Sequence, residues 1–359
     1  MSRKSKIING AIIILSVILM MGYILLVDGL DNILTVLSSA NPIWIFFGIG
    51  CMLLYWFCEG TVLNRAVGFF GPKMMARQSA KTCMIGQFFN CITPSSSGGQ
   101  PMQAYYMYRI GISVGSSSSA LMIRFITYQI ALTIFSTMVL ILKYQEFAAN
   151  IQGFQYLILF GFTINAIVTV MLLLIGFYQK IALVIMHSLM RFLAFIRIVK
   201  HLDRQLIVVD REVEKFHQGF LAIKTHKTIL VQMFGFTFLQ LLAFFSVPVM
   251  IAASFGVSLT PNLIFTMIAG AACVQMSSAF IPLPGATGGA ELSFYMLFGT
   301  VFPSHQINIA ILLWRLLTFY LPILLGLVFS RDVFGSKKMP SLPEDSDGEE
   351  NLFAEDNGM

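Results

Sequence analysis

The sequence predicts an all-α polytopic membrane protein with about six full spans and two re-entrant hairpins, arranged as an inverted repeat. Composition predicts the membrane class: 57% of the residues are hydrophobic and 11% are charged, whereas soluble domains carry about 25% charged residues. A pair of matching Pro/Gly-rich interruptions predicts the repeat. These observations argue against an ordinary soluble enzyme.

Apolar stretches set the expected number of spans. A helix needs about 20 residues to cross about 30 Å of hydrocarbon. Five stretches carry no charge or one near an end, and two more carry one arginine each: 7–27, 42–64, 156–178, 228–255 and 262–281, then 116–142 and 306–330. The stretch 7–27 is longer than a typical signal-peptide core of about 7 to 15 residues, so we expect an uncleaved first span.

The distribution of basic residues predicts the topology. Lys and Arg are in excess in cytoplasmic loops, and here they cluster at 3–6, 65–81, 109, 180–227 and 331–338. With these blocks inside, Lys143 is the one basic residue left for an outside loop, because Arg124 and Arg315 lie within spans. We therefore expect a plasma-membrane protein with both termini in the cytoplasm.

This topology leaves two segments that must enter and leave by the same face. Segment 82–108 begins and ends in the cytoplasm, whereas segment 262–305 begins and ends outside. Each is interrupted, by PSSSGGQP at 94–101 and by PLPGATGGA at 282–290. Proline and glycine runs of this kind break helices. Two re-entrant hairpins that enter from opposite faces fit both facts.

The two interruptions share a sequence pattern. The motif PxxxGG occurs at 94–99 and again at 284–289. Arg124 and Arg315 follow the glycine pairs by 25 and 26 residues, and each begins the pattern Arg-x-x-Thr-aromatic. We predict repeat units at about 42–142 and about 228–330 with opposite orientations, as in secondary transporters whose broken helices form a midplane site. A repeat that serves packing alone is the alternative.

The interruptions form the candidate substrate site. Backbone groups freed by a helix break must face protein or water, and a restarting helix presents N–H groups suited to phosphate. The residues assigned to head-group binding are Pro94, Ser95, Ser96, Ser97, Gly98, Gly99, Gln100, Arg124, Pro284, Thr287, Gly288, Gly289, Glu291 and Arg315. The five cysteines form no metal-ligand pattern. No catalytic residue, metal or cofactor is predicted.

Arg124 and Arg315 need partners inside the membrane. Each costs roughly 2.5 to 3.5 kcal/mol at the centre of a span. Glu59 and Glu291 are the main acids within the apolar segments, so we expect these, helix-end carbonyls or a ligand phosphate to supply the partners. Both acids are candidates for an ion pair or a proton carrier. The alternative is two structural arginines tied to hairpin carbonyls.

Two segments lie outside the repeat units. Segment 179–227 mixes apolar residues with nine Lys/Arg and predicts amphipathic helices on the anionic inner leaflet. Segment 340–359 has seven acids and no bases, which predicts a disordered tail. Residues 1–339 are then one integral membrane domain.

With these motifs the chain resembles the membrane region of the lysylphosphatidylglycerol synthase/flippase family, including stand-alone members. The resemblance rests on QFFNCITPSSSGGQP at 87–101, RFITY at 124–128, PLPGATGGAE at 282–291 and LLWRLLTFYLP at 312–322. It covers residues 7–330. In two-part members it implies a membrane domain that flips aminoacylated phosphatidylglycerol outward and a soluble domain that makes this lipid from aminoacyl-tRNA.

The resemblance implies a lipid translocase for anionic or aminoacylated phospholipid, such as lysyl-phosphatidylglycerol, with effects on surface charge and cationic peptide resistance. Only 29 residues follow Ser330, so we do not expect the soluble synthase domain. A phosphatidylglycerol lysyltransferase and a membrane partner of a separate synthase stay open as alternatives. The expected partners are a phospholipid head group and the bilayer. If the chain is the membrane partner of a separate synthase, that synthase is a further partner. No nucleic acid is expected.

Overall fold

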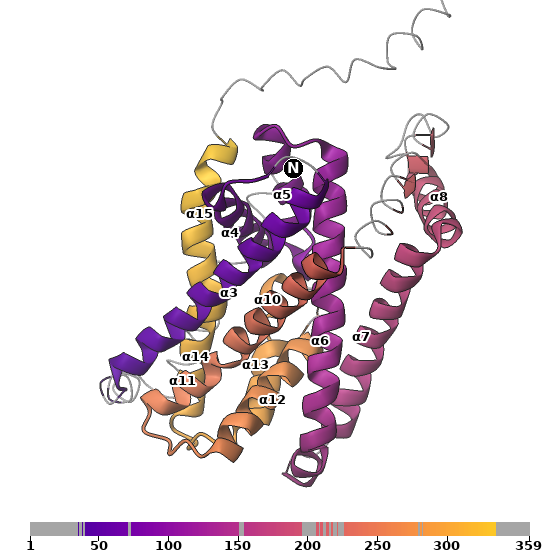
Figure 1. The fold of residues 1–359 in the computed structure, drawn as a ribbon. Coiled ribbons are helices and arrows are strands. Elements are labelled where there is room, and N and C mark those ends of the chain that lie inside the picture. Colours follow the sequence, from indigo (N-terminus) through magenta and orange to yellow (C-terminus); the bar gives the residue numbers. More distant parts are fainter. Residues whose placement is uncertain are drawn as a thin grey trace, which may run out of the picture.

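The structure, a computed structural model, describes residues 40–70, 73–150, 154–195, 226–278 and 283–334, with isolated residues at 35–38, 206–221 and 281. All regular secondary structure in these ranges is helical (Figure 1). The predicted all-α class is confirmed for this part of the chain. The predicted span at 7–27 and the predicted tail at 340–359 lie outside the described residues.

Among the described residues, four helices are long and apolar enough to cross a membrane. They coincide with the predicted spans 42–64, 116–142, 228–255 and 306–330. Their elements are α3 (Pro42–Phe70), α6 (Val114–Asn150), α10 with α11 (Lys227–Phe245, Val247–Ser254), and α14 with η3 and α15 (Ile307–Arg315, Leu316–Tyr320, Leu321–Phe334). The long, apolar character follows directly from the nearly charge-free sequence.

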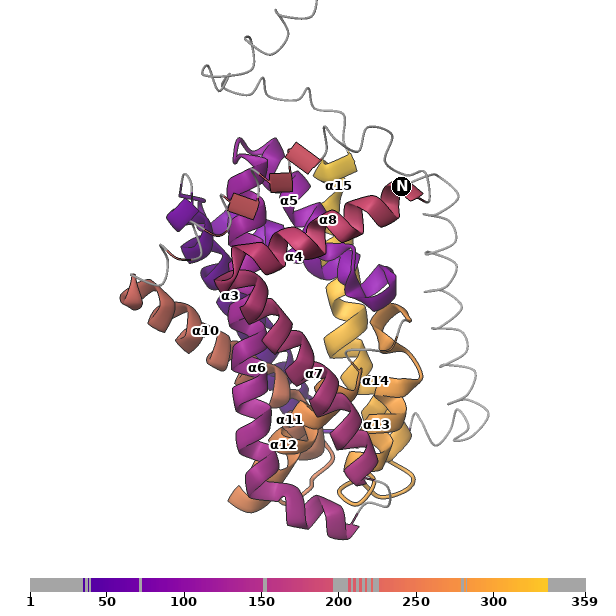
Figure 2. The ribbon, with the colours of Figure 1, turned by 90° about the vertical axis from the view of Figure 1, so that its right-hand side faces the viewer.

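A fifth span depends on how a sharp bend is interpreted. Helix α7 (Phe154–Phe177) matches the predicted span 156–178, and α8 (Gln179–Phe195) follows it after Tyr178 with a bend of 111°. In Figure 2, α8 runs across the end of α7 instead of continuing it. The described residues therefore contain four or five spans, and α8 is the part of segment 179–227 that they describe as a long helix.

The two predicted hairpins are both broken where the sequence motifs stand. Helix α4 (Ala76–Ile92) connects through the short turn η1 (Pro94–Ser96) to α5 (Gly99–Arg109), and α4 packs on α5. Helix α12 (Pro261–Ser278) connects through η2 (Pro284–Ala286) to α13 (Gly289–Phe298), which pack in the same way. We call these hairpin A and hairpin B. They lie in opposite halves of the bundle in Figures 1 and 2, and their tips η1 and η2 contact each other.

In both tips the two residues after the proline have left-handed backbone conformations. After Pro94, residues Ser95 and Ser96 have φ angles of 52°; after Pro284, Gly285 and Ala286 have φ angles of 61° and 53°. Left-handed conformations at non-glycine residues cost on the order of 1–3 kcal/mol each and persist only where surrounding structure fixes them. The short motif thus encodes a specific, strained turn in both hairpins.

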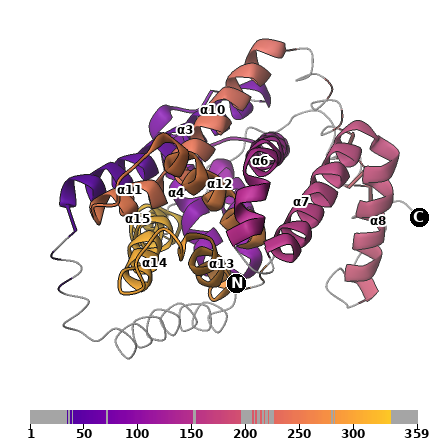
Figure 3. The same ribbon diagram turned by 90° about the horizontal axis from the view of Figure 1, so that it is seen from below.

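Packing joins hairpin A to the last span. Helix α4 packs closely on α15 at Gly326, where an added Cβ would lie 2.5 Å from the Phe88 Cβ and 2.8 Å from the Met84 carbonyl oxygen. Small residues allow this close approach of helices in membranes. Seen from below, α7 and α8 lie to one side of the bundle (Figure 3), and α7 contacts α6 and α12.

Candidate functional site

Arg315 is buried at the junction of α14 and the π-helical turn η3. Its Nε donates to Glu291 Oε1 at 2.7 Å, and its Nη1 donates to the carbonyl oxygen of Gly285 at 2.9 Å. Its Nη2 is buried and has no hydrogen-bond partner among the residues that the structure describes. A π-helical turn inside an α-helix often marks a functional site. This arginine therefore retains one free, charged donor inside the protein.

Aromatic rings cover the faces of the same guanidinium. Its Cζ lies 5.0 Å from the Trp314 ring centroid and 5.4 Å from the Phe319 ring centroid. Both distances are within the range of cation–π attraction, about 6 Å. With Nε and Nη1 bonded and the faces covered, Nη2 is the position left for an additional ligand.

Glu291 connects this arginine to the tip of hairpin B. Its second oxygen, Oε2, accepts from the backbone N–H of Gly288 at 2.7 Å. This contact caps the start of α13, where a carboxylate is also favoured by the helix dipole. A single carboxylate thus fixes both the arginine and the restarting helix.

Arg124 belongs to a second polar cluster, the Glu59 network, made of Glu59, Gln87, Gln103 and Arg124. Arg124 Nη1 donates to Glu59 Oε1 at 3.0 Å, and Nη2 donates to Gln103 Oε1 at 3.1 Å. Gln87 Nε2 donates to Glu59 Oε2 at 2.8 Å. The network joins α3, α4, α5 and α6 and, unlike Arg315, gives Arg124 acceptors on both terminal nitrogens.

The expected partners of both arginines are therefore present, namely the acids Glu59 and Glu291 and, for Arg315, a hairpin carbonyl. The two sites lie against the same helix. Gln87 of α4 contacts Glu59, and η2, whose Gly285 carbonyl accepts from Arg315, also packs on α4. Both ion pairs therefore lie beside α4.

Side chains of hairpin A accept hydrogen bonds from the backbone N–H groups at its tip. Gly98 N donates to Thr93 Oγ1 at 2.8 Å, and Gly99 N donates to Asn90 Oδ1 at 3.1 Å. The expectation that the restarting helices present bare N–H groups is thus wrong for Gly98, Gly99 and, because of its Glu291 contact, Gly288. Side-chain oxygens three to nine residues away satisfy these donors.

The remaining predicted site residues lie around the two tips. In hairpin A, the exposed ones are Pro94, Ser95, Ser96 and Ser97, and Gln100 is half-buried. In hairpin B, Pro284 is buried, Thr287 and Gly289 are half-buried and Gly288 is exposed. Because η1 contacts η2, the structure brings the two motifs together, although they are 190 residues apart in the sequence.

Sequence reasoning missed the amides that complete the Glu59 network, Gln87 and Gln103. Each is a polar residue inside a largely apolar hairpin, and this was the sequence feature that could have marked it as a site residue. Gln103 Nε2 also donates to the Thr82 carbonyl at 3.2 Å, so it ties α5 to α4. Gly86 provides room for this side chain, because a Cβ there would overlap the Gln103 amide.

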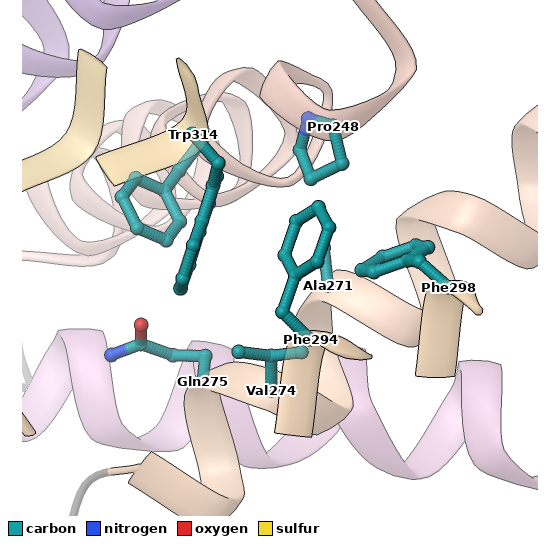
Figure 4. Close-up of a pocket in the computed structure, with 8 residues that line it drawn as sticks. Pro248, Ala271, Val274, Gln275, Phe294, Phe298 and Trp314 are labelled. Carbon is teal, nitrogen blue, oxygen red and sulfur yellow. The ribbon is translucent and has the colours of Figure 1, made fainter. Parts of the chain in front are cut away.

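A small pocket lies one residue from Arg315. It is lined by Phe244, Pro248, Ala271, Val274, Gln275, Phe294, Phe298 and Trp314 (Figure 4). Figure 4 shows the Phe294 ring and the Trp314 indole facing a space that has Gln275 at its edge. The volume of about 10 Å³ has room for about one water. In this conformation the pocket is too small for a phospholipid head group.

Metal chemistry finds no support in the described part of the chain. No three His, Cys, Asp or Glu side chains group there in a way that could hold a metal ion. The five cysteines are free thiols, and four of them are buried. The chemistry available at the site is charge recognition by the two arginines.

Comparison with known proteins places these features in a family. The family model described as "Lysylphosphatidylglycerol synthase TM region" matches residues 11–326. A "UPF0104 membrane protein" from Archaeoglobus fulgidus is 23% identical over 319 residues, covering 82% of this chain and 88% of that protein. "Uncharacterized protein MG306" from Mycoplasma genitalium is 25% identical over 351 residues, covering 89% and 86% of the two chains.

Proposed function

We propose, on the premise that the chain belongs to the lysylphosphatidylglycerol synthase transmembrane-region family, that it moves a phospholipid between the two leaflets of the plasma membrane. The cargo is an anionic or aminoacylated phospholipid, of which lysyl-phosphatidylglycerol is the one that the family description suggests. Both chain termini are cytoplasmic in this proposal.

The free Nη2 of Arg315 carries the proposal. Burying a donor without an acceptor costs the full desolvation free energy of that group, about 1–3 kcal/mol and more for a charged group. An apolar side chain at this position would pack in the span without that cost, so the charge calls for a ligand. A phosphate oxygen is the acceptor that suits a guanidinium best, and an anionic lipid brings one to this depth of the membrane.

The matched hairpins support a transport cycle. Both tips repeat the PxxxGG motif and the two left-handed residues after proline, and the hairpins lie in opposite halves of the bundle (Figure 1). We infer an inverted repeat of span, hairpin and span. Such repeats allow one half of a transporter to move against the other around a midplane site.

The contact between the tips determines how the site would open. Residues of η1 and η2 touch, and the nearest pocket has room for about one water. A head group therefore reaches Arg315 after the tips separate, from one side and then from the other. The acyl chains stay in the hydrocarbon, beside exposed apolar side chains of the outer helices such as Phe46 and Phe57.

Purified protein in proteoliposomes tests the proposal. Phosphatidylglycerol with a fluorescent head-group-proximal label is placed in both leaflets, and a membrane-impermeant reductant quenches the outer pool. Transport by the wild type makes the inner pool accessible within minutes. Arg315→Gln should abolish this, whereas Arg77→Gln, at an exposed position on α4, should not. Quenching limited to the outer pool with wild-type protein contradicts the proposal.

Measurements in cells separate translocation from synthesis. Aminoacylated and plain phosphatidylglycerol are quantified in total and in the outer leaflet, with and without the gene. Unchanged totals with less aminoacylated lipid outside support translocation. A lower total instead supports the lysyltransferase or synthase-partner alternatives.

A further inference from the structure

The Glu59 network differs from the Arg315 site because each terminal nitrogen of its arginine already has an acceptor. Arg124 Nη1 is bonded to Glu59 and Nη2 to Gln103. A head group can bind Arg315 Nη2 without breaking a bond. A phosphate that binds Arg124 at Nη1 competes with the Glu59 carboxylate for that nitrogen.

The position of the two sites makes this competition relevant to transport. Gln87 of α4 contacts Glu59, and η2, whose Gly285 carbonyl accepts from Arg315, packs on the same helix. Both arginine sites therefore lie beside α4. A head group that moves along α4 meets the two arginines in succession.

Glu59 has few groups that could replace Arg124. The side chain is buried, with 5% of its surface exposed. Around it lie Tyr55 on its own helix, Gln87 and Cys83 on α4, Arg124 and Tyr128 on α6, and Gln103 on α5. From α10, Gln240 bonds to Tyr55. Arg124 is the one cation that contacts Glu59 in the described part of the chain.

Charge balance then assigns a role to the acid. A buried carboxylate that loses its cation is strongly disfavoured, and a proton is the cation small enough to replace the guanidinium. We propose that Glu59 takes up one proton when an anionic head group binds Arg124, so that lipid movement is coupled to proton movement. The proton comes from water and is released when the Arg124–Glu59 pair forms again. This inference rests on the proposed lipid transport.

Proton uptake during binding tests the coupling without transport. Full-length protein in detergent is mixed, in weakly buffered solution at pH 7, with dihexanoyl phosphatidylglycerol, and a pH indicator reports protons while calorimetry reports bound lipid. Lipid held at Arg315 alone takes up no proton, so we expect uptake to rise to close to one proton per protein at saturation, when lipid occupies Arg124. Dihexanoyl phosphatidylcholine carries a quaternary ammonium that balances its phosphate, so its binding should cause no proton uptake. Inorganic phosphate should bind at least tenfold more weakly if the site takes a lipid.

Variants identify the group that accepts the proton. Glu59→Gln keeps the shape of the side chain and mimics its protonated form, so it should bind phosphatidylglycerol without proton uptake. The control Glu146→Gln, at the far end of α6, should retain the uptake of the wild type. If Glu59→Gln does not fold, the pair-neutral variant Glu59→Gln/Arg124→Gln should still bind at Arg315 and also lack uptake.

The outcomes distinguish this inference from the function on which it rests. Wild-type binding that saturates without proton uptake overturns the coupling and leaves lipid transport standing. Uptake that persists in Glu59→Gln overturns the assignment to Glu59. A wild type that binds none of the probes contradicts the head-group site itself, and with it both proposals.

Discussion

Arg315, which is buried, and Glu291, which is half-buried, form an ion pair with 2.7 Å between Nε and Oε1 that joins the last span to the tip of hairpin B. The same carboxylate also accepts from Gly288 N. Any change at the arginine is therefore transmitted directly to the turn that begins α13. This relationship makes Arg315 the first position to test.

Replacing Arg315 with lysine should reduce lipid transport by at least about tenfold while the protein stays folded. An ammonium is a compact point charge and cannot reproduce the planar fork that holds Glu291, Gly285 and a phosphate at once. The proteoliposome assay measures this, with Arg77→Lys as the matched control. Transport within twofold of the wild type would show that a charge alone is sufficient and would contradict the proposed phosphate geometry.

Replacing Gly285 with alanine should destabilise the protein by about 1–3 kcal/mol, the usual range for a strained or overpacked site. The residue has a φ of 61°, and a Cβ would overlap the ring of Phe319. Thermal unfolding can be followed with a thiol-reactive dye, because Cys58, Cys83 and Cys273 are buried in the folded protein and become accessible to the dye when it unfolds.

The control for this variant is Gly50→Ala on α3. A Cβ at Gly50 would have no described residue within 4 Å, and alanine favours a helix over glycine by up to about 1 kcal/mol. The control should therefore leave the melting temperature unchanged or raise it. A Gly285→Ala variant that melts with the wild type would argue against the tight turn at the hairpin tip.

The sequence predicted the hairpins well because their signal is strong and local. Proline and paired glycines at 94–99 and 284–289 forbid a continuous helix whatever surrounds them, and the structure breaks both helices there. The arginine partners were also predictable, since Glu59 and Glu291 are the main acids in the apolar segments. A buried cation must find an anion, and the choice was small.

Other features depended on tertiary packing and could not be predicted. The contact of η1 with η2 joins residues 190 positions apart, and no local pattern encodes it. Gln87 and Gln103 could have faced any neighbour. The bare N–H groups expected at Gly98 and Gly99 are capped by Thr93 and Asn90, because short polar side chains near a break can fold back onto it.

Gly86 and Gln103 should show coupled effects in a double-mutant cycle. A Cβ at Gly86 would overlap the Gln103 amide and push it away from Arg124, so Gly86→Ala should cost about 1.5–3 kcal/mol, the worth of a hydrogen bond to a charged group. Gln103→Ala removes the same bond. If both act through Arg124, the double variant is no worse than the poorer single one. Additive losses would contradict this shared mechanism.

Lys143 should stabilise the contact between α6 and hairpin B. The sequence placed it in an outside loop, but it is a buried residue of α6 whose Nζ donates to Glu146 Oε2 and to Asn262 Oδ1, both at 2.6 Å. Lys143→Met keeps the apolar stem and removes the charge, so we expect a loss of about 1–3 kcal/mol from the unpaired partners. Thermal unfolding measures it. An unchanged melting temperature would show that this cluster adds no stability.

Cysteine labelling should place the two ends of the bundle on opposite sides of the membrane. In a background without the five native cysteines, Ser113→Cys precedes α6 and Ser304→Cys precedes α14, both at exposed positions. An impermeant maleimide applied to intact cells should label Ser304→Cys, and Ser113→Cys only after permeabilisation, because basic residues favour the cytoplasm. Labelling of both from one side would mean that the hairpins enter from the same face. The inverted repeat would then fail, and alternating access around Arg124 and Arg315 would lose its structural basis.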